Sequence, residues 1–262
     1  MALFTDGPIS RGQDFQNYES GILDVANTEN IDLTAKGAMA QQEIGDEILL
    51  FLLRRATRDP QVIWWDPSAL QRRRIGTGDV VVSEPLSRWH ALRTLALFYR
   101  DAYFNQLNDR YQAKWQEYSQ RQQDASDTFF QIGVGLVFTP TPKPSAPTLA
   151  TVAGTGGADS YIVQITWVNA QQQEGAPSDP VTADTANGTQ LTVIAPAAPI
   201  NVTGWNVYAG DAVNAITLQN AVPIPAGQNW TMPSTGLAAG VAPGNGQTPD
   251  RWLINDRLIQ RG

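Results

Sequence analysis

The feature that most constrains this chain is a proline-rich stretch, with four prolines between Thr139 and Pro147. Proline lacks a backbone N–H and has a fixed φ angle, so this stretch continues neither a helix nor the middle of a sheet. The chemistry also changes here. The preceding residues are rich in Arg, Gln and aromatic side chains, whereas residues 148–249 contain no Lys or Arg. We therefore predict two domains joined by a linker at residues 140–147.

Composition is that of a folded chain and excludes several classes of protein. The 262 residues, with 42% hydrophobic residues and eight Trp, supply enough apolar surface for two cores. The net charge of -7 argues against a protein that mainly neutralises nucleic-acid phosphates. The absence of cysteine excludes disulfides and thiolate metal sites. We see no secretory signal, and the longest apolar run, Ile48–Leu53, is too short to span a membrane.

The first domain is predicted to be helical over residues 34–139, after an extended N-terminal arm at residues 1–33. Thr34 is a predicted N-cap for a helix that continues to about Thr57. Its apolar residues are expected to face the core: Met39, Ile44, Ile48, Leu49 and Leu52. A loop or small hairpin is predicted next, and it carries the basic run Arg72, Arg73 and Arg74.

Aromatic and aliphatic residues recur every three or four positions between Leu86 and Tyr118. Ser83 is a plausible N-cap for this segment, and Pro85 suits a first helical turn. The spacing predicts either one long helix or two antiparallel helices, because residues 105–109 are weak helix formers. An antiparallel pair would bury both aromatic faces together.

Two further segments are candidates for contacts between subunits. Phe129 and Phe130 begin a Gly-interrupted apolar stretch that could form a strand and pair with another subunit. Residues 244–262 are predicted to form a docking tail, although a last strand or short helix packed on its own chain is the alternative. The apolar residues of this tail are Trp252, Leu253, Ile254, Leu258 and Ile259.

The second domain, residues 148–243, has the alternation of short strands separated by Pro and Gly. Its clearest strand is Tyr161–Val168, and Asn187-Gly188 is a strong hairpin-turn signal. Several short strands in a segment of this length predict a β-sandwich. The fold class is therefore multidomain, with a helical domain followed by an all-β domain.

The sequence contains no constellation that predicts catalysis. His90 is the single histidine, so neither a Ser-His-Asp triad nor a two-histidine metal site can be built within one chain. The acidic residues lie mostly where solvated charges are expected, and Gly76-Thr77-Gly78 lacks the residues of a phosphate-binding loop. We expect no enzyme activity, no cofactor and no metal. The Arg72–Arg74 cluster is expected to meet an acidic protein partner or to remain solvated.

The second domain resembles the fibronectin type III and immunoglobulin-like modules of tailed-phage structural proteins. The residues that carry this resemblance are Tyr161–Ala170, Glu174–Ser178, Gly204–Tyr208 and Trp230-Thr231. Such modules occur on capsids, connectors, tails and baseplates, so the resemblance implies a fold and a virion setting but not one role.

The first domain looks like the helical head-to-tail adaptor, or connector, proteins of tailed phages. The resemblance is carried by Ile44–Arg55, Trp89–Tyr99 and Tyr111–Trp115. It implies a homo-oligomeric ring, usually dodecameric, between the portal protein and a downstream tail or nozzle protein. Such a ring passes DNA without reading its sequence, and an acidic lumen would suit that role because carboxylates repel phosphates.

The resemblances together predict a structural virion protein of the neck or tail region, present in the host cytoplasm during assembly and independent of membranes. One alternative is a tail or baseplate component. Another is a binding module whose β-sandwich attaches to the capsid or to host glycans, which exposed Trp and Tyr on one face would favour.

Overall fold

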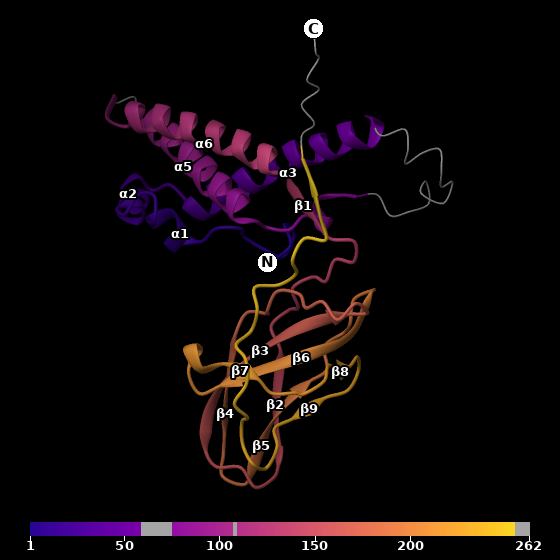
Figure 1. Cartoon of the computed structure of the whole chain (residues 1–262). Coiled ribbons are helices and arrows are strands. Elements are labelled where there is room, and N and C mark those ends of the chain that lie inside the picture. Colours follow the sequence, from indigo (N-terminus) through magenta and orange to yellow (C-terminus); the bar gives the residue numbers. More distant parts are fainter. Residues whose placement is uncertain (59–74, 107–108, 255–262) are drawn as a thin grey trace. The chain divides into compact units, whose positions relative to one another are not determined.

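The computed structural model describes residues 1–58, 75–106 and 109–254. Figure 1 shows long helices formed by the first half of the chain and antiparallel strands formed mainly by the second half. The mixed α plus β composition predicted from the sequence is confirmed at this level.

The chain folds into two compact units. The helical unit comprises Gly7–Leu136 and Pro249–Gly262, and the strand unit comprises Met1–Asp6 and Val137–Thr248. Met1–Asp6 therefore belong to the strand unit although the helical unit follows them in sequence, and the residues from Pro249 onward belong to the helical unit although the strand unit precedes them. The predicted division into successive domains did not anticipate that each unit contains one end of the chain.

The N-terminal segment contains helices where an extended arm was predicted. Helix α1 spans Gly12–Gln16 and α2 spans Ile22–Glu29, with Phe15 and Ile22 buried. The prediction of an extended arm over residues 1–33 is wrong here, because helices this short contribute too few apolar residues to show a helical period.

Helix α3 spans Leu33–Arg58, close to the predicted range. Its N-cap is Asp32 rather than Thr34. The Asp32 Oδ1 atom accepts hydrogen bonds from the backbone N–H groups of Thr34, at 2.8 Å, and Ala35, at 3.1 Å. An aspartate at this position satisfies two N–H groups that have no partner within the helix.

Helices α5 (Glu84–Gln106) and α6 (Gln112–Ile132) form an antiparallel pair, which decides between the two arrangements that the sequence left open. A short 3₁₀ helix, η3 (Asp109–Tyr111), precedes α6. Aromatic rings from both helices pack along the contact between α5 and α6, which we call the seam. Their centroids are 5.5 Å apart for Trp89 and Phe129, 5.5 Å for Tyr99 and Tyr118, and 5.7 Å for Tyr103 and Trp115. Residue numbers increase along α5 and decrease along α6 through these three pairs, as expected for antiparallel helices. The regularly spaced aromatic residues therefore form the contact between the two helices.

Polar contacts fix α3 against this pair. Arg93 on α5 contacts Glu43 on α3 with its Nε at 2.7 Å, and its Nη1 donates to Gln122 on α6 at 3.1 Å. Lys36 and Asp101 form a second ion pair between α3 and α5 at 2.6 Å. One arginine thus connects all three long helices, with a planar fork of donors suited to two acceptors.

The apolar stretch after α6 forms a strand only at Val134–Leu136, named β1. Phe129 and Phe130 belong to α6, and Gly133, with φ of +113°, ends that helix. Strand β1 pairs with β10 (Arg251–Leu253) of the same chain, and its Leu136 forms a bridge with Val80. The prediction that this strand pairs with another subunit is therefore wrong, because segments of its own chain occupy its edges.

The strand unit contains two antiparallel sheets. One has the order β2-β5-β9, and the other has the order β4-β3-β6-β7, with β8 also paired to β6. Strand bounds are Thr148–Ala153 for β2, Asp159–Asn169 for β3, Val181–Thr185 for β4, Thr189–Ile194 for β5, Val202–Gly210 for β6, Thr217–Leu218 for β7, Ile224–Pro225 for β8 and Trp230–Thr231 for β9. Strand β2 was not predicted because almost all of its side chains are exposed and show no alternation.

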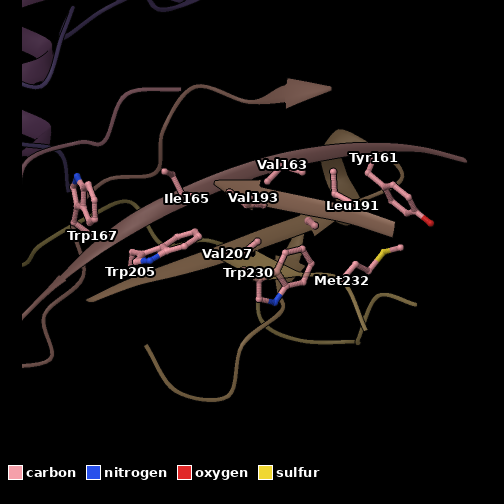
Figure 2. Close-up of a cluster of buried hydrophobic side chains, with 11 residues drawn as sticks. Tyr161, Val163, Ile165, Trp167, Leu191, Val193, Trp205, Val207, Trp230 and Met232 are labelled. Atoms are coloured by element: carbon pink, nitrogen blue, oxygen red, sulfur yellow. The ribbon is translucent and has the colours of Figure 1, made fainter. Parts of the chain in front are cut away.

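The two sheets share one hydrophobic core. Figure 2 shows side chains of β3, β5, β6 and β9 gathered in one cluster. Trp205 and Val207 come from β6, whereas Leu191 and Val193 come from β5 of the other sheet, and all four are fully buried. Alternate residues of each strand point into this cluster, as expected for sheets with one covered face.

The predicted linker at residues 140–147 is hydrogen-bonded within the strand unit instead of acting as a free spacer. The buried Gln247 accepts a hydrogen bond from the backbone N–H of Thr141 at 2.6 Å. It also donates to the carbonyl of Thr139 and to the side chain of Gln173, both at 2.9 Å. A buried amide with these partners holds the segment in place, which composition alone did not reveal.

A second polar cluster lies on the β3–β6 sheet, on the side away from the core. Glu174 Oε1 accepts hydrogen bonds from Thr166, from Asn206 at 3.1 Å and from the Tyr208 hydroxyl at 2.7 Å. All three donors are buried. Burial, together with the hydrogen bond to Glu174, raises the pKa of Tyr208 above its ordinary range. One carboxylate thus satisfies three donors from two neighbouring strands.

Candidate interaction surfaces

The residues predicted to form interfaces fall into three groups in the structure. Arg72, Arg73, Arg74, Leu258 and Ile259 lie outside the described residues. Phe129 is fully buried, with ring centroids of Trp89 at 5.5 Å and Phe130 at 5.1 Å. It is therefore a core residue of the helical unit and not a surface residue. Phe130 is half-buried and contacts Phe51 of α3 at 5.1 Å.

Of the C-terminal residues, Trp252 and Leu253 lie in β10, and Ile254 follows it directly. Leu253 is buried opposite Val134, whereas Trp252 and Ile254 are 42% and 50% exposed. The alternative in which the tail ends in a strand packed on its own chain is therefore the one observed for these residues. Only two of the three side chains remain on the surface.

Helix α3 exposes several apolar side chains, and two of them, Met39 and Leu49, were predicted to face the core. Ile48 is fully buried, but Leu49, Leu50 and Leu53 are 39%, 53% and 53% exposed, and Met39 is also exposed. We call Leu49, Leu50 and Leu53 the α3 leucine row. A signal for it was present, because six consecutive apolar residues from Ile48 to Leu53 surround a helix and cannot all face one side.

Helix α6 has an exposed surface of the opposite character. Between Gln116 and Asp127, its exposed side chains are amides and carboxylates: Gln116, Glu117, Gln120, Gln123, Asp124 and Asp127. We call these six residues the α6 polar face. The one cation in this part of the helix, Arg121, is held by Glu117 at 3.1 Å. The α6 polar face is therefore acidic and rich in hydrogen-bonding groups.

The segment between α1 and α2 is fixed to α6 through Glu19. Glu19 Oε2 accepts hydrogen bonds from Lys114 at 2.6 Å and from the Tyr118 hydroxyl at 3.0 Å. Burial raises the pKa of Glu19, but these hydrogen bonds and the Lys114 charge outweigh it, so the pKa lies below its ordinary value of 4.5. Burial and the hydrogen bond to Glu19 raise the pKa of Tyr118. Glu19 is thus held in its ionised form.

Acid should loosen this attachment. Because the pKa of Glu19 is lower in the folded state, its contribution to stability is present above about pH 4.5 and is lost as the pH falls further. We expect urea denaturation, followed by circular dichroism at the helical band, to show a smaller loss of stability on acidification for Glu19→Gln than for the wild type. Glu117→Gln is the control, since its exposed pair with Arg121 contributes little. Equal acid sensitivity of the wild type and Glu19→Gln would contradict this role.

The single histidine, His90, is held by hydrogen bonds inside the helical unit. His90 is buried, with Nε2 3.0 Å from the carbonyl oxygen of Gly37 and Nδ1 2.9 Å from Ser10 Oγ. A carbonyl can only accept, so Nε2 carries the proton and Nδ1 accepts from the Ser10 hydroxyl. Burial lowers the pKa of His90 below 6.5. Ser10 is buried as well, so this pair is closed to a substrate.

Within residues 1–58, 75–106 and 109–254, no three His, Asp or Glu side chains are grouped to hold a metal ion. None of the helices in this described part combines the length and apolar character that a membrane span needs. Comparisons with protein-family models, curated proteins and solved structures found no match. The exposed surfaces described above are therefore the basis for a functional proposal.

Proposed function

We propose that this protein is a structural subunit of a tailed-phage virion. In this proposal its copies form a dodecameric connector ring between the portal protein and a downstream tail or nozzle protein, and the ring continues the DNA channel. One observation carries the proposal: the helical unit exposes an apolar surface, the α3 leucine row, and a separate acidic surface, the α6 polar face. A ring subunit needs one surface for its neighbour and another for the lumen.

The α3 leucine row supports a contact between subunits. Leu50 and Leu53 lie one turn apart on α3, and about half of each side chain is accessible to water. Burying the exposed part of three leucines would contribute roughly 3 kcal/mol per contact. That is modest for one contact, but a closed ring repeats the contact at every interface.

The α6 polar face supports a lumen that does not bind its cargo. Carboxylates such as Asp124 and Asp127 repel DNA phosphates, and the glutamine side chains offer only neutral contacts. A basic lumen would bind the DNA tightly and slow its passage. A subunit arrangement in which Arg72–Arg74 line the channel would count against this assignment.

We further propose that the strand unit is an immunoglobulin-like or fibronectin type III-like module. Support comes from the pairing of β2 with β5 in one sheet, and of β3 with both β4 and β6 in the other. This division of successive strands between two sheets around one core is typical of such sandwiches. Glycan binding is not favoured, because all Trp and Tyr side chains of residues 148–248 are buried and provide no stacking platform.

Substitution in the α3 leucine row tests the ring directly. Leu50→Asp is expected to abolish ring formation, because it places a charge in each subunit contact, while leaving the fold intact, because Leu50 is an exposed side chain. The matched control is Ile200→Asp, the same type of change at an 89% exposed position in the strand unit. Mass photometry and circular dichroism should show subunits that are folded but dissociated for Leu50→Asp and an unchanged ring for Ile200→Asp. A ring that survives Leu50→Asp would exclude the α3 leucine row as the contact.

A further inference from the structure

Strand β2 lies at the outer edge of its sheet. In the order β2-β5-β9 it has a neighbour on one side only, among the residues that the structure describes. It is six residues long and pairs with β5 along its whole length, from Thr148 opposite Ile194 to Ala153 opposite Thr189. An edge of this length presents a row of backbone groups that can pair with another strand.

The register shows which backbone groups face the open edge. Thr151 lies opposite Leu191, and the Leu191 carbonyl accepts a hydrogen bond from the N–H of Met232, next to β9, at 2.8 Å. In an antiparallel ladder, opposite residues direct their backbone groups either toward each other or both away. The N–H and C=O of Thr151 therefore face the open edge, and the two-residue period gives the same direction to Leu149 and Ala153.

The edge of β2 lacks the features that usually prevent pairing. Residues 148–158 contain no charged side chain, and β2 contains neither proline nor an irregularity in its register. Every β2 side chain except the half-buried Leu149 is exposed, and all are small or medium in size. Lysine, proline and bulges are the common means of blocking an edge strand, and β2 has none of them.

We infer that this edge binds the β2 strand of a second copy of the chain, antiparallel about a two-fold axis through Thr151. In that register Thr151 faces its own counterpart, and Leu149 faces Ala153 of the other copy. The outward backbone groups of these residues then form roughly six hydrogen bonds between the copies. A neutral strand meets an identical neutral strand without charge repulsion, and Thr–Thr and Ala–Val pairs suit a sheet surface.

This inference goes beyond the proposed ring and does not depend on it. The α3 leucine row lies in the helical unit, whereas β2 lies in the strand unit. Loss of the ring in Leu50→Asp would therefore leave the pairing of β2 strands intact, and loss of the pairing would leave ring closure intact. The two claims can fail separately.

Cysteine cross-linking tests the register. The chain contains no cysteine, so a single introduced thiol reports one position. Thr151→Cys would place two thiols opposite each other at a Cα separation of about 5.5 Å, within disulfide range. Ala150→Cys, the control, would place them beyond about 7 Å, where no bridge forms without backbone movement. We expect disulfide-linked dimers at least about tenfold more abundant for Thr151→Cys in the full chain under mild oxidation. Equal cross-linking at both positions, or none at Thr151, would overturn the register.

Two further variants test the pairing without disturbing the fold. Thr151→Pro removes an outward N–H that the β2–β5 ladder does not use, so the strand unit should fold while the paired species is lost. Thr151→Lys and Thr151→Glu should each lose pairing through like charges, and an equimolar mixture should regain it. Native mass measured over a range of concentrations gives the result, with wild-type circular dichroism as the check on folding. Pairing that persists in Thr151→Pro, or that is not restored by mixing the charged variants, would contradict a two-fold contact at Thr151.

Discussion

Replacing Glu174 with alanine is expected to lower the stability of the strand unit by about 3 kcal/mol. The change removes the acceptor shared by Thr166, Asn206 and Tyr208, all of which are buried on neighbouring strands. Buried donors without an acceptor lose their hydrogen bonds and remain shielded from water. Amide hydrogen exchange in β3 and β6 should therefore accelerate by on the order of a hundredfold.

Two control variants separate this effect from a general loss of charge. Glu174→Gln keeps a carbonyl acceptor at the same position and should lose only about 1 kcal/mol. Asp211→Ala removes an exposed carboxylate from the same unit. It should change the stability of the strand unit by less than about 0.5 kcal/mol and leave amide exchange in β3 and β6 nearly unchanged. If Glu174→Ala behaved like Asp211→Ala, the polar cluster would not contribute to stability.

Replacing Trp89 with alanine is expected to lower the stability of the helical unit by about 4 kcal/mol. Trp89 is fully buried on α5, with ring centroids of Phe129 and Phe130 of α6 at 5.5 Å and 5.6 Å. Truncation leaves a cavity at the point where α5 and α6 meet, and the surrounding aromatic rings can fill it only in part. Guanidinium denaturation followed at the helical circular dichroism band measures the loss.

Trp115→Ala is the matched control for this change. Trp115 lies at the other end of the same seam, 5.7 Å from both Tyr103 and Phe104, but it is only half-buried. Its loss should cost about half as much, because water already reaches one side of the ring. Equal losses for the two variants would show that the seam is not packed most tightly at Trp89.

Elements with a long, regular pattern could be predicted from the sequence. The aromatic spacing of α5 and α6 and the alternation of β3 reflect helices and strands with one buried side, and each is long enough to show its period. Helices α1 and α2 are too short for that. Strand β2 could not be predicted either, because its mostly exposed side chains have no alternating pattern.

Contacts between distant segments could not be predicted. An apolar segment such as Trp252-Leu253 can pack against many apolar partners, and only the fold shows that it pairs with β1, more than a hundred residues earlier. The polar partners of Gln247 and Glu174 are likewise set by tertiary structure. Burial of Ile48 next to exposed Leu49 and Leu50 follows from which side of α3 meets α5, and a run of uniform hydrophobicity does not contain that information.

The most direct test of the proposed connector is the native mass of the purified full chain, measured by mass photometry with and without a matching portal protein. The proposal predicts a particle with the mass of a dodecamer that forms, or is stabilised, when the portal is present. A monomer or trimer that does not respond to the portal would contradict it. In that case the protein would be assigned to another position in the tail, such as the baseplate.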